Sequence, residues 1–164
     1  MCIRDRHKGP VYLRFGRPKV PVFTDPTQKF EIGKGIKLID GTDVTIIATG
    51  HLVWESLEAA KILNKSGISA EVINIHTIKP LDKKIILKSV EKTRCVVSAE
   101  EHNFLGGLGE SISRVLSKNL PLPQEFIATK DTFGESGTPA QLMEKYGLNA
   151  NSIVDKAKKV ISRK

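Results

Sequence analysis

The sequence predicts an α/β domain in which a mostly parallel sheet lies between two layers of helices, preceded by an isolated strand and an extended linker. Three observations predict it. Short β-branched and apolar runs alternate with segments of helical periodicity, the connections are short, and glycine or proline marks most boundaries. With 164 residues, of which 40% are hydrophobic and 27% charged, the chain can form one core of ordinary size.

The first 34 residues do not follow this alternation. Residues 1–8 suit neither a strand nor an amphipathic helix, and we expect a non-native or disordered start there. Residues 10–15 (PVYLRF) form a short β-type run, and Pro18, Pro21 and Pro26 then exclude regular structure. We therefore predict an orphan strand and linker over residues 9–34, and the α/β domain over residues 35–164.

The first two strand–helix units occupy residues 43–92. Residues 43–49 (DVTIIAT) are typical of a strand buried on both faces, and a helix follows to about Ser66, where Gly67 provides a left-handed stop. Residues 70–75 (AEVINI) form the second strand, and Asp82 can cap a helix that runs to about Lys92. The first helix is expected to turn one apolar stripe inward, made of Val53, Leu57, Ala60 and Leu63.

The second half continues the pattern. A third strand is predicted over residues 95–99, a helix over 109–118 and a shorter strand over 124–129. Thr138 followed by Pro139 predicts a helix start. A last amphipathic helix begins near Asn151, with its inward residues expected to be Ile153, Val154, Ala157, Val160 and Ile161. Asp40-Gly41 is a turn between two β segments.

Composition excludes several classes of function. The net charge of +8 comes mostly from lysines spread over predicted helices, and aromatic residues make up only 5%, so a solvated surface is favoured over nucleic-acid binding. No apolar run approaches 18 residues, and the first residues lack the apolar core of a secretory signal. Cys95 opens an apolar strand and is expected to be a small buried hydrophobe in a reducing compartment, the cytoplasm.

Residues 96–109 (VVSAEEHNFLGGLG) only partly match a dinucleotide-binding fingerprint. Five residues separate the strand from the glycines, and Ile112 stands where the third glycine should be. The favoured interpretation is structural: Gly106, Gly107 and Gly109 allow a sharp turn and close packing of the next helix. The amides at that helix start could still attract an anion.

Glu100, Glu101 and His102 resemble an acid–base cluster. Adjacent carboxylates on a strand end point to opposite sides, however, so we expect one of them to face an interface or to cap the following helix. His51 follows the first strand, where open α/β sheets often bind ligands, but a helix-start residue without chemistry is favoured. No zinc site is predicted, because the other histidines lack ligand spacing: His7, His76 and His102.

Arg17 is the one candidate binding residue. It follows the orphan strand, in FGRP, and a guanidinium fork at a strand end suits a phosphate group. The alternative, which the residues alone favour, is an exposed arginine with no specific role.

Five sequence blocks, in order, carry a family resemblance: GPVYLRFGR, VTIIATGHLVWESLEAAKIL, INIHTIKPLD, VVSAEEHNFLGGLGESI and DTFGESGTPAQLMEKYGL. Together they resemble the C-terminal part of transketolase, and above all the separately encoded C-terminal subunit found in many prokaryotes. Deoxyxylulose-phosphate synthases and the β subunits of 2-oxoacid dehydrogenases share the third and fourth blocks. FGESG favours transketolase.

The resemblance implies a function for the complete enzyme. Transketolases transfer a two-carbon ketol unit between sugar phosphates, using thiamine diphosphate held by Mg²⁺ or Ca²⁺. An N-terminal domain with a GDG motif binds the diphosphate, and a middle domain binds the aminopyrimidine and supplies a glutamate. Residues 9–34 would then be the last strand of the pyrimidine-binding domain plus a linker, and residues 35–164 a C-terminal domain that supports dimerisation.

The same resemblance assigns Arg17 to the substrate phosphate. It implies no catalytic, cofactor-binding or metal-binding residue in this chain, which we expect to be an enzyme fragment, inactive alone, with a transketolase N-terminal subunit or domain and a second copy as partners. Two alternatives stay open: a fragment of 1-deoxy-D-xylulose-5-phosphate synthase, and a non-catalytic oligomerisation or binding module.

Overall fold

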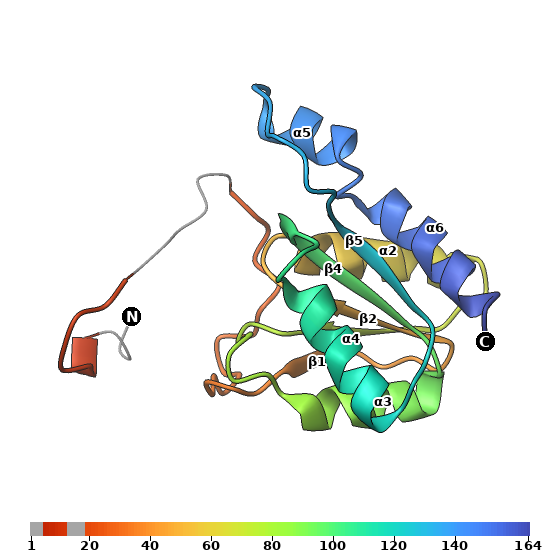
Figure 1. Cartoon of the computed structure of the whole chain (residues 1–164), viewed down its shortest axis with the longest axis horizontal. Coiled ribbons are helices and arrows are strands. Elements are labelled where there is room, and N and C mark those ends of the chain that lie inside the picture. The colour runs from red at the N-terminus through yellow and green to blue at the C-terminus, as the bar shows by residue number, and fades with distance from the viewer. Residues whose placement is uncertain (1–4, 13–18) are drawn as a thin grey trace.

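The computed structural model describes residues 5–12 and 19–164, and within them it has the predicted architecture. One five-stranded sheet, in the order β1-β3-β2-β4-β5, carries helices on both faces (Figure 1). Only β1 runs antiparallel to its neighbour; the other three pairs are parallel. The elements are β1 (Ile36–Ile39), β2 (Val44–Ala48), α2 (Leu52–Lys65), β3 (Ala70–Asn74), α3 (Lys83–Thr93), β4 (Val96–Asn103), α4 (Leu108–Asn119), β5 (Gln124–Thr129), α5 (Pro139–Lys145) and α6 (Ala150–Ile161).

The two faces of the sheet have separate cores, because successive strand residues point to opposite sides. Ile46 packs with the side chains of α2 and α6, whereas the next residue, Ile47, packs with those of α3 and α4. Every residue of β2 and β3 is buried. The continuous apolar run predicted for a strand covered on both faces is therefore confirmed.

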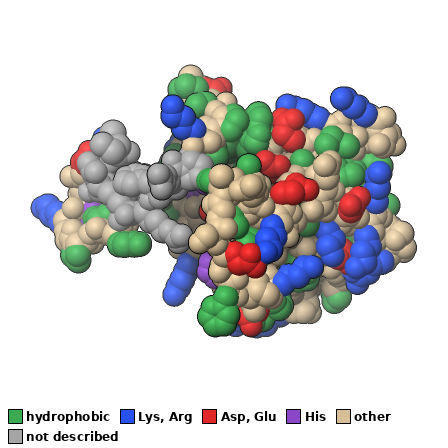
Figure 2. Space-filling model, turned by 90° about the horizontal axis from the view of Figure 1, so that it is seen from above, with side chains coloured by type: hydrophobic (Ala, Val, Ile, Leu, Met, Phe, Trp, Pro, Cys, Tyr) green, Lys and Arg blue, Asp and Glu red, His purple; other side chains and the backbone are tan. Residues whose placement is uncertain are grey.

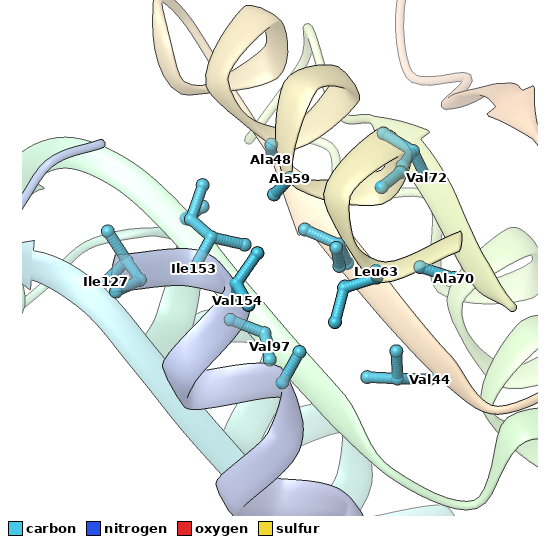
Figure 3. Close-up of a cluster of buried hydrophobic side chains, with 14 of the residues drawn as sticks. Val44, Ala48, Ala59, Leu63, Ala70, Val72, Val97, Ile127, Ile153 and Val154 are labelled. Carbon is cyan, nitrogen blue, oxygen red and sulfur yellow. The ribbon is translucent and has the colours of Figure 1, made fainter. Parts of the chain in front are cut away.

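The larger core lies between the sheet and the pair α2 and α6 (Figure 3). Leu63 of α2 and Ile153 of α6 are fully buried and belong to the same cluster as the strand residue Val97. On α2 the inward stripe is shifted slightly from the predicted one, since Leu57 is only half-buried while Ser56 and Ala59 are buried.

Local signals set the ends of the helices as predicted. Gly67 has a φ of 76°, which a left-handed helix stop requires. Asp82 caps α3 by accepting a hydrogen bond from the amide of Ile85 at 3.2 Å, and Thr138 forms a capping box with Gln141 at the start of α5. One end was predicted wrongly: β4 continues to Asn103, four residues beyond the expected end at Ala99.

The Asp40-Gly41 turn joins β1 to β2, which are not neighbours in the sheet, because β3 lies between them. The turn passes directly over the start of β3. A Cβ on Gly41 would lie 2.2 Å from the backbone of Ala70 and Glu71. Ser69 holds the crossing in place, since its amide donates to Asp43 Oδ2 at 2.7 Å and its carbonyl accepts from the amide of Asp43 at 2.8 Å.

Residues 19–34 contain neither helix nor strand, in agreement with the predicted linker. Most of the predicted orphan strand lies outside the described residues, so that strand stays a prediction. Within the described part of the chain, no helix has the length and hydropathy needed to cross a membrane. On the face shown in Figure 2, basic and acidic side chains are interspersed.

Candidate functional site at the carboxyl ends of β2 and β4

The carboxyl ends of β2 and β4 lie side by side, and the chain leaves them in opposite directions. α2 leads from β2 to β3, whereas α4 leads from β4 to β5 on the other side of the sheet. Open α/β sheets bind ligands at such a switch point. A crevice of about 310 Å³ lies there, bordered by Thr49 and Gly50 after β2 and by residues 100–102 of β4.

Glu100 closes the floor of this crevice. Its side chain is buried, and its two carboxylate oxygens accept hydrogen bonds from the amides of Leu108 and Gly109, each at 2.8 Å. These amides begin α4, where the helix dipole favours a negative charge. The anion that the sequence allowed at this helix start is therefore the protein's own carboxylate, and the expected capping role of one glutamate is confirmed.

The glycines of the following loop make room for that carboxylate. A Cβ on Gly107 would lie 2.2 Å from Glu100 Oε2, and one on Gly109 would lie 2.6 Å from the ring of Phe126. Gly106 has a φ of 76°, so it makes the sharp turn. The structural interpretation of the three glycines is confirmed: they permit the turn and the close approach of α4 to the sheet.

Glu101 points the other way, as expected for the next residue along a strand. Its carboxylate is partly exposed and lies 3.2 Å from Nδ1 of His51, the residue immediately before α2. His102 is exposed, and its Nδ1 is 2.9 Å from the carbonyl oxygen of Asn103. The three neighbours Glu100, Glu101 and His102 thus have three different environments and form no acid–base cluster.

A second, larger groove of about 620 Å³ adjoins the crevice. Trp54, Met143 and Tyr146 make its apolar wall, with Lys19 of the linker at its margin. His51 and Glu101 belong to this groove as well. Arg17, the predicted phosphate-binding residue, lies outside the described residues.

An ion-pair cluster that the sequence analysis missed lies at the amino end of β5. Glu125, with a side chain only 9% exposed, lies 2.8 Å from Lys156 Nζ, 3.0 Å from Lys159 Nζ and 2.7 Å from Arg163 Nη1. Burial alone would raise the pKa of Glu125, but hydrogen bonds and charges from Lys156 and Lys159 outweigh it and lower the pKa to about 2. The signal available in the sequence was the row of basic residues along the last helix.

The crevice is poorly suited to a diphosphate or a metal ion. Its helix amides are already bonded to Glu100, and Glu101 adds a second negative charge nearby. Among residues 5–12 and 19–164, no three His, Cys, Asp or Glu side chains are grouped so as to hold a metal. This crevice therefore does not fit the diphosphate group of thiamine diphosphate. Cys95 is buried, and burial raises the pKa of its thiol, so it is no ready nucleophile either.

Fold and site together define a mostly parallel α/β domain in which a buried carboxylate occupies the helix start beside the crevice at the switch point. Residues 33–153 match the family model of the transketolase C-terminal domain. The chain belongs to this family.

Comparisons with known proteins agree. A 6-deoxy-6-sulfo-D-fructose transketolase subunit of Clostridium sp. is 44% identical over 96% of this chain and 49% of its own length. The 1-deoxy-D-xylulose-5-phosphate synthase of a Synechococcus species is 35% identical over 91% of this chain and 24% of its own length. A solved split-gene transketolase, an inactive β4 tetramer, superposes with a TM-score of 0.89 at 44% identity, over 94% of this chain and 50% of its own. The chain thus spans about half the length of the transketolase relatives it matches.

Proposed function

We propose that this chain is the C-terminal part of a transketolase, an enzyme that transfers a two-carbon ketol unit between sugar phosphates with thiamine diphosphate. Membership of the transketolase C-terminal domain family supports the enzyme class. The observation that supports a structural role for this chain is Glu100, which occupies the anion-binding helix start with its own carboxylate. The domain therefore contributes structure to the enzyme, while other parts carry the chemistry.

In this proposal residues 9–34 are the end of the pyrimidine-binding domain plus a linker, and residues 35–164 are the C-terminal domain. The cofactor and its Mg²⁺ or Ca²⁺ are held by a transketolase N-terminal subunit or domain and by the middle domain. The domain supports dimerisation, and the assembled enzyme works in the cytoplasm. The split-gene relative is a tetramer of its own β subunit, which supports the proposal that this domain takes part in oligomer formation.

The first test is made on the chain alone. Titration calorimetry with thiamine diphosphate and Mg²⁺ should show no saturable binding, and the chain should transfer no ketol groups. Micromolar binding would overturn the proposed division of labour. Adding the N-terminal partner should restore transfer from a ketose phosphate to an aldose phosphate.

Arg17 is proposed to contact the substrate phosphate. In the assembled enzyme, Arg17→Ala should raise the Michaelis constant for phosphorylated sugars and spare an unphosphorylated acceptor. Equal losses for both acceptors would contradict a phosphate contact. Lys19→Ala, two residues along the same segment, is the matched control.

A second candidate is 1-deoxy-D-xylulose-5-phosphate synthesis, which the matches to such synthases favour. Assaying the assembled enzyme for deoxyxylulose phosphate separates the two reactions. The third possibility, a non-catalytic oligomerisation or binding module, predicts a stable dimer of this chain that gains no activity from any N-terminal partner.

A further inference from the structure

The end of the linker, residues 30–35, lies against the loop that joins β3 to α3. We infer that these residues, called the strap below, bind to residues 76–82, called the clasp. This contact fixes the path of the linker on the domain. Three contacts from the strap converge on one short segment of the INIHTIKPLD block, to which the catalytic proposal gives no role. The inference concerns this chain alone and does not depend on the proposed activity.

The carboxylate of Asp82 divides its two oxygens between helix and strap. Oδ1 accepts from the amide of Ile85 and caps α3, whereas Oδ2 accepts from the amide of Gly35 at 3.0 Å. These two functions are separable by mutation. Serine is an equally good helix cap, but its shorter side chain cannot also reach Gly35.

Two glycines bring the strap close to the domain. Gly33 has a φ of 85°, and a Cβ there would lie 3.1 Å from Pro80 Cγ of the clasp. A Cβ on Gly35 would lie 2.7 Å from Ile75 Cδ1 and 3.0 Å from Ile85 Cγ2. Between them Lys34 donates its amide to the carbonyl of Glu31 at 3.1 Å, which closes a tight turn.

Phe30 anchors the beginning of the strap. Its ring lies on the ring of His76, with centroids 4.4 Å apart and planes inclined by 34°. The Nδ1 atom of His76 is 2.9 Å from Thr77 Oγ1, while Nε2 is buried and has no hydrogen-bond partner among the described residues. The contact with Phe30 is made by the face of the His76 ring, and a phenylalanine at this position could make it as well.

Trypsin can report whether the strap is closed. Lys34 is exposed but sits inside the strap, whereas Lys19 lies upstream of it in the linker. We expect cleavage after Lys19 to be rapid, and cleavage after Lys34 to require local opening. Asp82→Ser should speed cleavage after Lys34 at least tenfold, since a hydrogen bond to a charged acceptor is lost, and should lower the free energy of unfolding by no more than this one bond contributes.

Matched variants distinguish the loss of strap contacts from a general destabilisation of the domain. Phe30→Ser should also speed cleavage after Lys34, whereas Ile62→Ser, an exposed apolar residue of α2, should have no effect. His76→Phe should keep the strap closed, and His76→Ala should open it. The inference is overturned if Lys34 is cut as fast as Lys19 in the unmodified chain. It is also overturned if Asp82→Ser and Phe30→Ser both leave the Lys34 rate unchanged.

Discussion

Replacing Glu100 should remove a large share of the domain's stability. Glu100→Ala deletes a buried carboxylate that accepts two hydrogen bonds of 2.8 Å, and it leaves the amides of Leu108 and Gly109 without an acceptor. An unsatisfied buried donor costs about 1–3 kcal/mol, and the lost charge at the start of α4 adds up to about 1 kcal/mol. We expect the free energy of unfolding to fall by about 3–5 kcal/mol. Part of the loss is offset, because the variant no longer has to bury a charged carboxylate on folding.

Urea denaturation, followed by circular dichroism, measures this change. Glu100→Gln keeps the shape and one acceptor oxygen but turns an NH₂ group toward the second amide, so it should lose about 2 kcal/mol. Glu101→Gln is the matched control: the carboxylate is half-exposed, pairs with His51, and should change stability by less than about 1 kcal/mol.

Rescue by a small anion gives a stricter test. Acetate should fill the space left in Glu100→Ala and raise its stability with increasing concentration, with no such increase in the unmodified chain. If Glu100→Ala lies within about 1 kcal/mol of the unmodified chain, the carboxylate does not hold the start of α4, and the argument that Glu100 occupies this anion-binding position fails with it.

Three further predictions concern other parts of the domain. The pKa of Glu125, lowered from 4.5 to about 2, means that its ion pairs stabilise the fold above pH 4.5 and lose this effect as the pH falls toward 2. Glu125→Gln should therefore cost about 1–3 kcal/mol at pH 7 and little near pH 2, which urea titrations at both pH values would reveal; a constant difference would contradict the ion-pair explanation. Gly41→Ala should destabilise the domain by more than about 3 kcal/mol, because a Cβ would lie 2.2 Å from the backbone of β3. A thermal midpoint close to that of the unmodified chain would contradict the close crossing of the β1–β2 turn over β3. Cys95 should react with a thiol reagent only after unfolding, since it is fully buried and its thiol pKa is raised; fast labelling of Cys95 in the native chain, with the other cysteine removed by Cys2→Ser, would refute this.

Much of the fold could be predicted from the sequence because its signals are local. The stop at Gly67, the cap at Asp82 and the capping box at Thr138 each depend on residues within one helical turn. β4 was the exception. It continues past Ala99 through a polar stretch that pairs with the end of β5 at Asn103, so tertiary pairing overrode composition there.

The parts that resisted prediction depend on residues far apart in the sequence. Asp82 and Gly35, which close the strap, are separated by 47 positions, and Glu125 and Arg163 by 38. For Glu100 the sequence left two roles open, capping the following helix or facing an interface. Only the folded position of α4, close against the sheet, distinguishes the two.

The pairing of α2 with α6 also bears on how the chain folds during synthesis. The apolar face formed by Val44, Val97 and Ile127 is covered jointly by an early helix and by α6, the last element in chain order (Figure 3). While the ribosome is still translating the second half, α2 can cover only its own part of that face. The nascent domain must therefore keep an apolar surface accessible to chaperones until α6 emerges, and its cooperative folding cannot be completed before α6 has been synthesised.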